Sequence, residues 1–323
     1  MKRTVLIFMF AMMAMVYSQA QQIAVVSKSG STDVYQTLKE AIEGASRNSV
    51  IYLPGGGFQI HDSVKITKPL TIIGIGHKAN SENADGNTVI SGNLFFNEGS
   101  SNSAIMGCYI SGNVIIGDGG ASVDNVLIRY CNLNAVDVRN NTCTGTIVNQ
   151  NYIRNGSGFN EASCTFTNNI AHSICNLDGG TISNNIITSS TYVDRWTNCC
   201  FALCDNCTIS YNILLDCYHL GCGGSCHVFR NMIQNAEWGD DFVNVTAEWA
   251  DVFSNYNNGS ITPASEFKFK GEYNQYSECG IYGGTGFSDG ALPPVPYIVS
   301  KSIPEQTDAS GKLNIKIRVK AGE

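Results

Sequence analysis

The sequence predicts an all-β protein in which short strands stack in parallel as a solenoid. Its composition supports this class, because only 15% of the 323 residues are charged, against roughly 25% in an ordinary soluble domain. Clusters of Gly, Ser and Asn also interrupt the apolar segments throughout the chain. The strongest observation is a repeated frame with a mean period of 21 residues, since self-similarity at a fixed period is typical of stacked repeats.

Residues 1–20 are predicted to be a signal peptide. Lys2 and Arg3 precede an apolar run over 5–16, and Ser18-Gln19-Ala20 offers small side chains at a cleavage site. We therefore expect a secreted protein, periplasmic or at the cell surface. The mature chain is expected to have no transmembrane segment, because no other stretch approaches the roughly 18 apolar residues that a spanning helix needs.

The mature chain is acidic. Removal of the leader takes away two of the 20 basic residues and none of the 27 acidic ones. Such a balance disfavours nucleic acid and anionic membranes as partners.

The first element after the leader is predicted to be a helix over 34–47. Asp33 is the expected N-cap, with Gln36 at the third helical position. One face of this helix would be apolar, formed by Tyr35, Leu38, Ala41, Ile42 and Ala45. A solenoid needs its ends covered, so we expect this helix to cap the N-terminal end.

One column of residues organises the middle of the chain. The frame apolar-any-any-Asn-apolar recurs at spacings of 16 to 27 residues, and its fourth position holds Cys108, Cys131, Asn151, Asn169, Asn185, Asn212, Asn231 and Asn255. The residue three positions earlier is always apolar: Ile105, Ile128, Val148, Phe166, Ile182, Ile209, Val228 and Val252.

Each repeat is expected to add one strand spacing of about 4.8 Å and to pair in parallel with its neighbours. The apolar column would fill the interior. Asn suits the turn because it tolerates the left-handed conformation, and stacked Asn amides can also form a hydrogen-bonded ladder. A β-sandwich with coincidental Asn residues at its turns is the alternative.

The segments "TLKEAIEGA", Leu53-Pro54-Gly55 and "KPLTIIGIG" follow one another in the N-terminal part of the chain. In this order, and with the Asn column, they resemble the pectate-lyase-like superfamily over roughly residues 24–275. The resemblance implies a right-handed parallel β-helix of roughly ten coils over residues 21–290, with an N-terminal helical cap. The resemblance implies little about activity, because that superfamily includes lyases, hydrolases, adhesins and proteins of no known activity.

Residues 291–323 are predicted to form a short C-terminal β tail or cap. Its last segment alternates strictly, with Leu313, Ile315, Ile317 and Val319 on one face and mostly basic residues on the other. This pattern is typical of a half-buried strand. The charged face would discourage edge pairing, or, alternatively, would make the strand a basic docking element for an anionic partner.

Cysteines also recur in register. Cys207 and Cys226 each lie five residues before a column Asn, and Cys108 and Cys131 occupy the column itself. We expect these pairs to stack on adjacent coils as mostly free thiols, since Cys packs well in a narrow interior. Zinc or a metal cluster bound by this Cys-rich region is the alternative.

Aromatic, basic and acidic residues gather in one stretch, at similar offsets after successive column residues. They suggest a carbohydrate groove, in which rings cover sugar faces and carboxylates act as acid and base. The candidate carbohydrate-binding residues are Trp196, Tyr218 and Trp238, and the candidate catalytic residues are Arg195, His219, Asp240 and Asp241. The alternative is that the Trp residues, Trp249 included, pack in outer loops and that the Asp residues form turns.

Two catalytic mechanisms found in that superfamily have partial counterparts among these residues. Gly239-Asp240-Asp241 is similar to an element of polygalacturonase-type hydrolases, but the other motifs of that family are missing. Pectate-lyase chemistry needs carboxylates that hold calcium beside a basic residue, and Asp178, Asp194 and Arg195 offer such a set. No cofactor is certain from the sequence. Calcium bound by Asp178 and Asp194 is one candidate, and turn formation by these Asp residues is the alternative. Neither catalytic set is complete.

We therefore predict an exported protein that binds a polysaccharide or cell-surface glycan on its lateral face. One alternative is a polysaccharide lyase or glycoside hydrolase with a non-standard site. The other is a structural or adhesive surface protein. The clustering of all three Trp residues on neighbouring coils favours the first two, because a purely structural solenoid does not require it.

Overall fold

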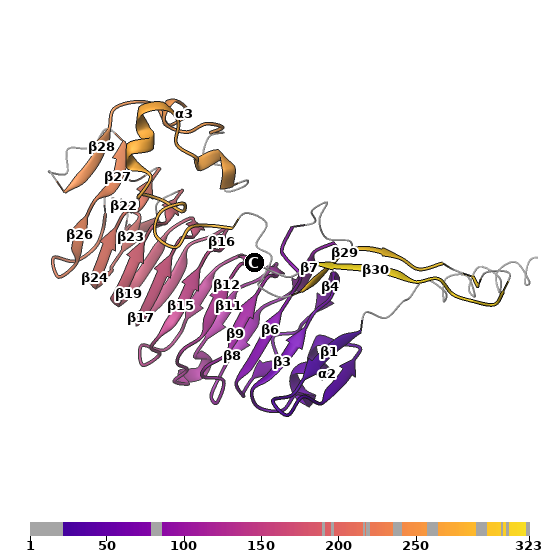
Figure 1. The fold of residues 1–323 in the computed structure, drawn as a ribbon. Helices are drawn as coiled ribbons and strands as arrows, with labels where there is room; N and C mark the ends of the chain where they lie inside the picture. Colours follow the sequence, from indigo (N-terminus) through magenta and orange to yellow (C-terminus); the bar gives the residue numbers. More distant parts are fainter. Residues whose placement is uncertain are drawn as a thin grey trace, which may run out of the picture.

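The computed structural model describes residues 22–78, 86–188, 191–194, 197–215, 217, 220–234, 241–256, 264–288, 296–304, 306–307 and 310–320. Strands are the commonest element among these residues, and most of the strands pair in parallel within two large sheets of sixteen and ten strands (Figure 1). The predicted β class and its parallel pairing are therefore confirmed. In the part of the chain that the structure describes, no helix is long and apolar enough to cross a membrane.

The N-terminal end is closed by antiparallel strands and one helix. Strand β1 (Ile23–Val26) pairs antiparallel with β2 (Thr32–Tyr35) and with β3 (Ser49–Tyr52). Between β2 and β3 lies helix α2 (Leu38–Gly44). Leu38, Ala41, Ile42 and Ala45 are buried in the main core, as the apolar stripe predicts.

The predicted helix over 34–47 is too long at both ends, because α2 begins four residues later and ends at Gly44, and Tyr35 of its predicted apolar face belongs to β2. Asp33 belongs to strand β2, and Thr37 is the N-cap. Its side-chain oxygen accepts a hydrogen bond from the Glu40 N–H, and the Glu40 carboxylate accepts one from the Thr37 N–H, both at 3.2 Å. This reciprocal capping box satisfies two donors at the helix start, whereas Asp33 and Val34 pair with β1 and so lie before the helix.

Successive segments of the chain visit three rows of strands. Row 1, in the sixteen-stranded sheet, runs through β3, β6 (Leu70–Ile73), β9 (Ala104–Met106), β12 (Leu127–Arg129), β15 (Thr146–Asn149), the later parts of β17 (Ser157–Thr167) and β19 (Ile174–Ser183), β24 (Asp205–Ser210) and β26 (His227–Phe229). Row 2, in the same sheet, contains β5 (Lys65–Ile66), β8 (Leu94–Phe96), β11 (Val114–Ile116), β14 (Val136–Val138), the first parts of β17 and β19, and β23 (Phe201–Ala202).

The third row is the ten-stranded sheet. It contains β4 (Gly56–Gln59), β7 (Thr88–Ser91), β10 (Tyr109–Ile110), β13 (Asn132–Leu133), β16 (Tyr152–Ile153), β18 (Ile170–Ala171), β20 (Ile186–Ile187), β25 (Ile213–Leu214), β27 (Asn231–Gln234) and β28 (Phe242–Val245). A small hairpin, β21 (Thr191–Asp194) with β22 (Thr197–Cys199), follows β20. Short helical turns are η1 (Asp118–Gly120), η2 (Ala264–Phe267) and η3 (Gly271–Tyr276).

The predicted apolar column fills the interior along row 1. Its first six members are fully buried and pair in register from strand to strand: Ile105, Ile128, Val148, Phe166, Ile182 and Ile209. Val228 continues the register on β26 and is half-buried. The last predicted repeat, with Val252 and Asn255, is wrong because Val252 ends the short helix α3 (Trp249–Val252).

The Asn column forms a buried, hydrogen-bonded ladder, but its Asn residues do not adopt the predicted left-handed conformation. Asn151, Asn169, Asn185, Asn212 and Asn231 are buried, and each accepts hydrogen bonds from the preceding member of the column. The left-handed residue is instead the one before each column position: Gly107, Tyr130, Gln150, Asn168, Asn184, Tyr211 and Arg230, with φ between 52° and 67°. The ladder Asn is therefore present for its hydrogen bonds and not for its backbone conformation.

The outer face of the ten-stranded sheet is apolar and covered. Tyr152, Ile170, Ile186, Ile213 and Met232 lie in register on that face and join a second hydrophobic cluster with α3 and residues 279–281. The covering segment is held by the left-handed Asn residues. The Nδ2 of Asn168 donates to the backbone oxygens of Ile281 and Gly283 at 2.9 and 2.8 Å, and that of Asn184 donates to Glu278 at 2.6 Å.

The C-terminal tail is a hairpin that extends away from the stacked strands (Figure 1). Strand β29 (Tyr297–Ser302) pairs antiparallel with β30 (Lys316–Lys320). The predicted half-buried strand is wrong, since all five residues of β30 are exposed. Leu313, Ile315, Ile317 and Val319 are 46 to 57% exposed. The alternating pattern is present, but the described body does not cover its apolar face.

Candidate functional site

Most of the predicted site residues cannot be placed. Arg195, Trp196, Tyr218, His219, Trp238 and Asp240 lie outside the described residues, as does the side chain of Asp194. The strands of the ten-stranded sheet that come before their segments, β20, β25 and β27, are neighbours in that sheet, and the β21–β22 hairpin follows β20. Whether these side chains share one face therefore stays a prediction.

Asp241 lies directly before β28, at the turn that carries the Asn ladder. Its side chain is exposed, and its backbone oxygen accepts a hydrogen bond from the Arg230 N–H at 2.5 Å. The Arg230 guanidinium lies 5.7 Å from the centre of the Tyr211 ring and forms an ion pair with Glu278. The described contact of Asp241 is therefore a backbone one, and its exposed carboxylate is not paired with Arg230, which binds Glu278.

Asp178, the other described candidate, stacks on a second carboxylate. It pairs in register with Asp205 between β19 and β24, and its Oδ1 accepts a hydrogen bond from Asn206 at 2.6 Å. Ser225 donates to Asp205 at 3.1 Å. Among the described residues, no three His, Cys, Asp or Glu side chains gather as a ligand set. Calcium at Asp178 and Asp194 stays a prediction.

The stacked cysteines are free thiols, as expected. Cys108 lies beside Cys131, because the residues that follow them pair in register, and the Cys207 N–H lies 3.4 Å from the Cys226 sulfur. Cys108, Cys131, Cys207 and Cys226 form no disulfide, and burial raises the pKa of Cys131 and of Cys207 to about 12. These thiols are therefore protonated at neutral pH and suited to packing rather than to nucleophilic chemistry.

Trp249, the one described Trp, is a packing residue. It is 5% exposed and stacks on Phe253 with ring centroids 5.5 Å apart. Its Nε1 donates to the backbone oxygen of Leu215 at 3.2 Å, which satisfies the buried donor. For this Trp, the packing alternative is correct.

A feature that our sequence reasoning missed lies on the outer side of row 1. Each member of the buried column Phe166, Ile182 and Ile209 is flanked on both sides by a hydroxyl residue, in the pairs Thr165/Thr167, Thr181/Ser183 and Thr208/Ser210. Because side chains alternate along a strand, these flanking residues all point outward. We call these six residues the hydroxyl face. The pattern Thr-apolar-Thr or Thr-apolar-Ser beside the column could have revealed it.

The hydroxyl face is regular and accessible. Its strands are about 4.8 Å apart, and the two hydroxyls on each strand are about 6.6 Å apart. Thr165 is exposed, Ser210 is buried, and the other four residues are half-buried. Row 1 continues at one side with Asn149, whose Nδ2 donates to the Thr167 hydroxyl at 2.9 Å. The face therefore presents hydroxyl and amide groups in a fixed array.

Aromatic rings end the hydroxyl face at its other side. His227 pairs with Thr208 and Phe229 pairs with Ser210, on strand β26. The two rings are 4.8 Å apart, and Phe229 meets Tyr211 edge to face at 5.7 Å. His227 is exposed and Phe229 is half-buried. Rings beside a polar array can cover the apolar face of a sugar while the hydroxyls bind its edges.

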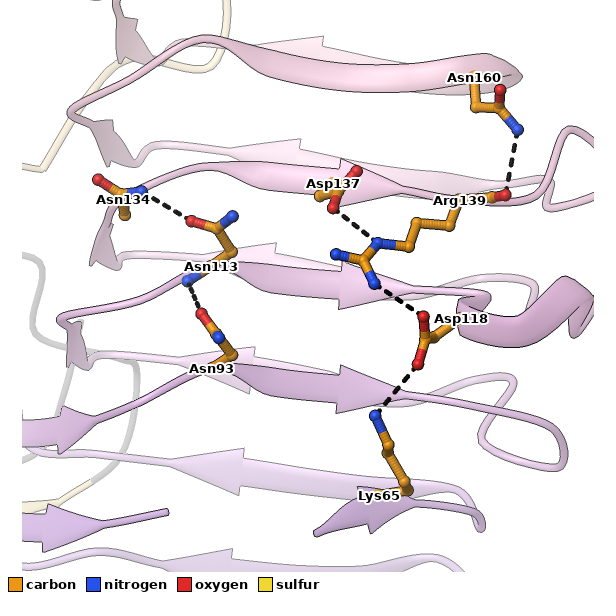
Figure 2. A network of polar contacts seen from close by, with 8 residues as sticks. All are labelled: Lys65, Asn93, Asn113, Asp118, Asn134, Asp137, Arg139 and Asn160. Carbon is orange, nitrogen blue, oxygen red and sulfur yellow. Dashed lines mark hydrogen bonds and ion pairs between the residues drawn. The ribbon is translucent and has the colours of Figure 1, made fainter. Parts of the chain in front are cut away.

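A charged network occupies the outer side of row 2 (Figure 2). Asp118 accepts hydrogen bonds from Arg139 at 2.7 Å and Lys65 at 3.1 Å, and Arg139 also binds Asp137 at 2.8 Å. These hydrogen bonds, that of Arg139 first, lower the pKa of the Asp118 carboxyl. The charges neutralise one another, so the network offers no carboxyl group poised as a general acid.

The network covers apolar side chains that face outward. Phe95 and Ile115 alternate with interior residues of row 2, yet they are only 5% and 2% exposed. The Lys65 ammonium lies 3.2 Å from the centre of the Phe95 ring. Long basic side chains shield apolar surface in this way while their charged ends stay in water. The network therefore has a structural role.

A second, superficial Asn ladder lies at the turns beside row 2 (Figure 2). The Asn93 side-chain oxygen accepts from the Asn113 N–H at 2.8 Å, and the Asn113 oxygen accepts from the Asn134 Nδ2 at 2.7 Å. Asn155 continues the series at 2.7 Å. The stacked rows are therefore joined by side-chain amide hydrogen bonds in two places, at the buried Asn ladder and at this superficial one.

Comparison with known proteins gives no match: no protein-family model, no curated protein and no solved structure is significantly similar to this chain.

Proposed function

We propose that the chain is an exported right-handed parallel β-helix, similar to the pectate-lyase-like superfamily, that binds a glycan along one lateral face. Three rows of strands visited in turn, pairing in register with a buried Asn ladder, support the β-helix. Helix α2 at one end and the covering segment with α3 near the other supply the protection that a stacked repeat needs.

The observation that carries the function is the hydroxyl face with its aromatic end. Six hydroxyl residues on three adjacent strands, in register with His227 and Phe229, form a polar strip of constant strand spacing. A polymer with repeated hydroxyl groups can contact such a strip at several points. Each hydrogen bond contributes only about 1 kcal/mol, so binding would depend on several contacts made together.

Binding is better supported than turnover. The carboxylates of the charged network are paired with Arg139 and Lys65, and Asp241 is exposed. General acid catalysis on a glycoside needs a carboxyl group with a raised pKa. The predicted catalytic residues Arg195, His219 and Asp240 lie outside the described residues, so an activity assay belongs in the same experiment.

The test is retention of the protein on immobilised xylan, mannan, β-glucan and polygalacturonate, with and without calcium. Thr181→Val with Thr208→Val should weaken retention on the bound glycan at least fivefold, and so should Phe229→Ala. Thr71→Val is the matched control, since Thr71 is an outward residue of row 1 on β6 and lies outside the hydroxyl face. Retention on none of these glycans, or equal losses in the control, would contradict the proposal. Release of oligosaccharides would favour the enzymatic alternative.

A further inference from the structure

Among the described residues, the exposed apolar side chains are concentrated on the C-terminal hairpin. Five of the nine large apolar side chains that are exposed in the described residues belong to it, at 46 to 57% exposure: Ile303, Leu313, Ile315, Ile317 and Val319. Contiguous apolar surface on a protein marks an interaction site. A two-stranded hairpin is also marginally stable in water unless another surface covers it. This hairpin therefore fits a surface outside its own chain.

The same hairpin is basic in an acidic protein. Residues 21–295 carry 13 basic and 24 acidic side chains, whereas residues 296–323 carry five basic and three acidic ones. On β30, Lys316, Arg318 and Lys320 alternate with Ile317 and Val319. The strand therefore has one apolar face and one basic face, both exposed.

The hairpin is attached to the body only at its base. Ile298 lines a cavity of about 250 Å³ together with Tyr52, Leu53 and Pro54, while every described residue from 300 to 320 is exposed. Figure 1 shows β29 and β30 extending away from the stacked strands. A five-residue strand spans about 16 Å, which exceeds the Debye length of about 8 Å in physiological salt. Charges near its far end are thus screened from the acidic body.

Two kinds of partner can cover an apolar and basic hairpin. A second hairpin from another copy would bury well under the roughly 1,000 Å² of a stable interface, and it would bring two basic strands together. An anionic lipid surface accepts both faces. Apolar side chains enter the headgroup boundary by about 5 to 10 Å, and long basic side chains on the opposite face then reach flanking phosphates.

We propose that the β29–β30 hairpin docks this protein on an anionic lipid surface. Leu313, Ile315, Ile317 and Val319 enter the interfacial layer, and Lys316 and Arg318 bind the lipid phosphates. The net acidic charge still keeps the body away from such a surface. The hairpin confines the lipid contact to one projecting element and leaves the hydroxyl face, on a different part of the molecule, free for glycan.

The test is co-sedimentation of the full chain with two kinds of vesicle, one of phosphatidylcholine alone and one with equal parts of phosphatidylglycerol. We expect binding to the anionic vesicles at least tenfold tighter than to the neutral ones, and weaker binding as salt rises from 50 to 500 mM. Lys316→Glu with Arg318→Glu should lower the affinity at least tenfold, because each basic residue near an anionic surface contributes about fivefold. Ile317→Ser with Val319→Ser should also lower it at least tenfold.

The matched control is Lys28→Glu with Arg47→Glu, which makes the same charge change on two exposed body residues. It should leave binding within about threefold, and all variants should keep the parental melting temperature and glycan retention. Equal binding to both vesicles, or an equal loss in the control, would overturn the proposal. Failure to bind vesicles, together with a dimer that the hairpin substitutions dissociate, would identify the hairpin as an interface between copies. None of these outcomes affects the glycan proposal, which is read from retention alone.

Discussion

Asn169 donates two hydrogen bonds to the side-chain oxygen of Asn185, one from its backbone N–H at 2.8 Å and one from its Nδ2 at 3.1 Å. Its Nδ2 also donates to the backbone oxygen of Val148 at 2.8 Å. Asn151 repeats the relationship one repeat earlier. The polar groups of these fully buried amides are thus used within the column, as buried polar groups require.

Replacement of a ladder residue should therefore be costly. Asn169→Ala removes the acceptor of the buried Asn151 N–H and the side-chain donor to the Val148 backbone oxygen. We expect a loss of about 3 kcal/mol or more in the free energy of unfolding, because each unsatisfied buried group costs about 1–3 kcal/mol. Urea-induced unfolding measures this loss. Asn155→Ala, in the superficial ladder, is the control and should cost less than about 1 kcal/mol. Similar losses in both variants would contradict the role of the buried ladder.

The charged network predicts a pH-dependent contribution to stability. The hydrogen bonds of Arg139 and then Lys65 lower the pKa of Asp118 from its ordinary value of 3.8. A lowered pKa in the folded state means that the carboxylate stabilises the fold above pH 3.8, and that this contribution is lost as pH falls through the folded-state pKa. Asp118 is partly exposed, at 28%, so we expect about 1 kcal/mol or less.

Unfolding free energies of the parent and of Asp118→Asn, measured from pH 7 to pH 2.5, test this prediction. The difference should be constant above about pH 5 and should shrink in acid. In an Arg139→Met background the pH-dependent part should be smaller, since Arg139 is the main cause of the lowered pKa. A difference that grows as pH falls would show that the sign is wrong.

The repeat could be predicted from the sequence because each repeat has the same two requirements. Interior packing requires an apolar residue at one position, and the ladder requires Asn three residues later. The apolar column and the buried Asn residues follow from this regularity. The register failed at Val252, because an apolar residue three positions before an Asn fits a helix as well as a strand. The helix start failed because Asp33 with Gln36 and Thr37 with Glu40 have the same spacing, and only the pairing of Thr32–Tyr35 with β1 excludes the earlier start.

The remaining differences depend on tertiary surroundings. The alternating pattern of β30 predicts an apolar face, but whether that face is buried depends on residues elsewhere in the chain. The prediction that β30 is half-buried was therefore wrong. The hydroxyl face, in contrast, is readable, because its residues flank Phe166, Ile182 and Ile209 in the sequence. Our reasoning followed the Trp residues and so missed it.

Two glycines of the stacked strands should differ in how strongly an added methyl group destabilises the fold. Gly180 has φ +126°, and a Cβ there would overlap the backbone oxygen of Cys164 on the neighbouring strand. Gly180→Ala should therefore lower the free energy of unfolding by more than about 2 kcal/mol. Gly158 lacks a positive φ, and its Cβ would meet only the Cys175 sulfur at 3.6 Å. Gly158→Ala should change stability by less than about 1 kcal/mol in either direction. Thermal unfolding of both variants measures these changes. A Gly180→Ala protein as stable as the parent would contradict the close approach of the Gly180 and Cys164 backbones.

The buried thiols give a prediction about chemical reactivity. Burial raises the pKa of Cys222 to about 11 and that of Cys131 to about 12. Only the thiolate reacts with iodoacetamide, so at pH 8 roughly one Cys222 side chain in a thousand is reactive at any moment. We expect alkylation of Cys222 to accelerate about tenfold per pH unit between pH 8 and pH 10. Cys131, fully buried, should stay unlabelled until the protein unfolds. Peptide mass spectrometry after timed labelling measures both rates, and denatured protein should react at all 13 cysteines. Rapid labelling of Cys131 in the folded protein, or a disulfide between Cys207 and Cys226, would show that the stacked thiols are not packed as free, protonated side chains.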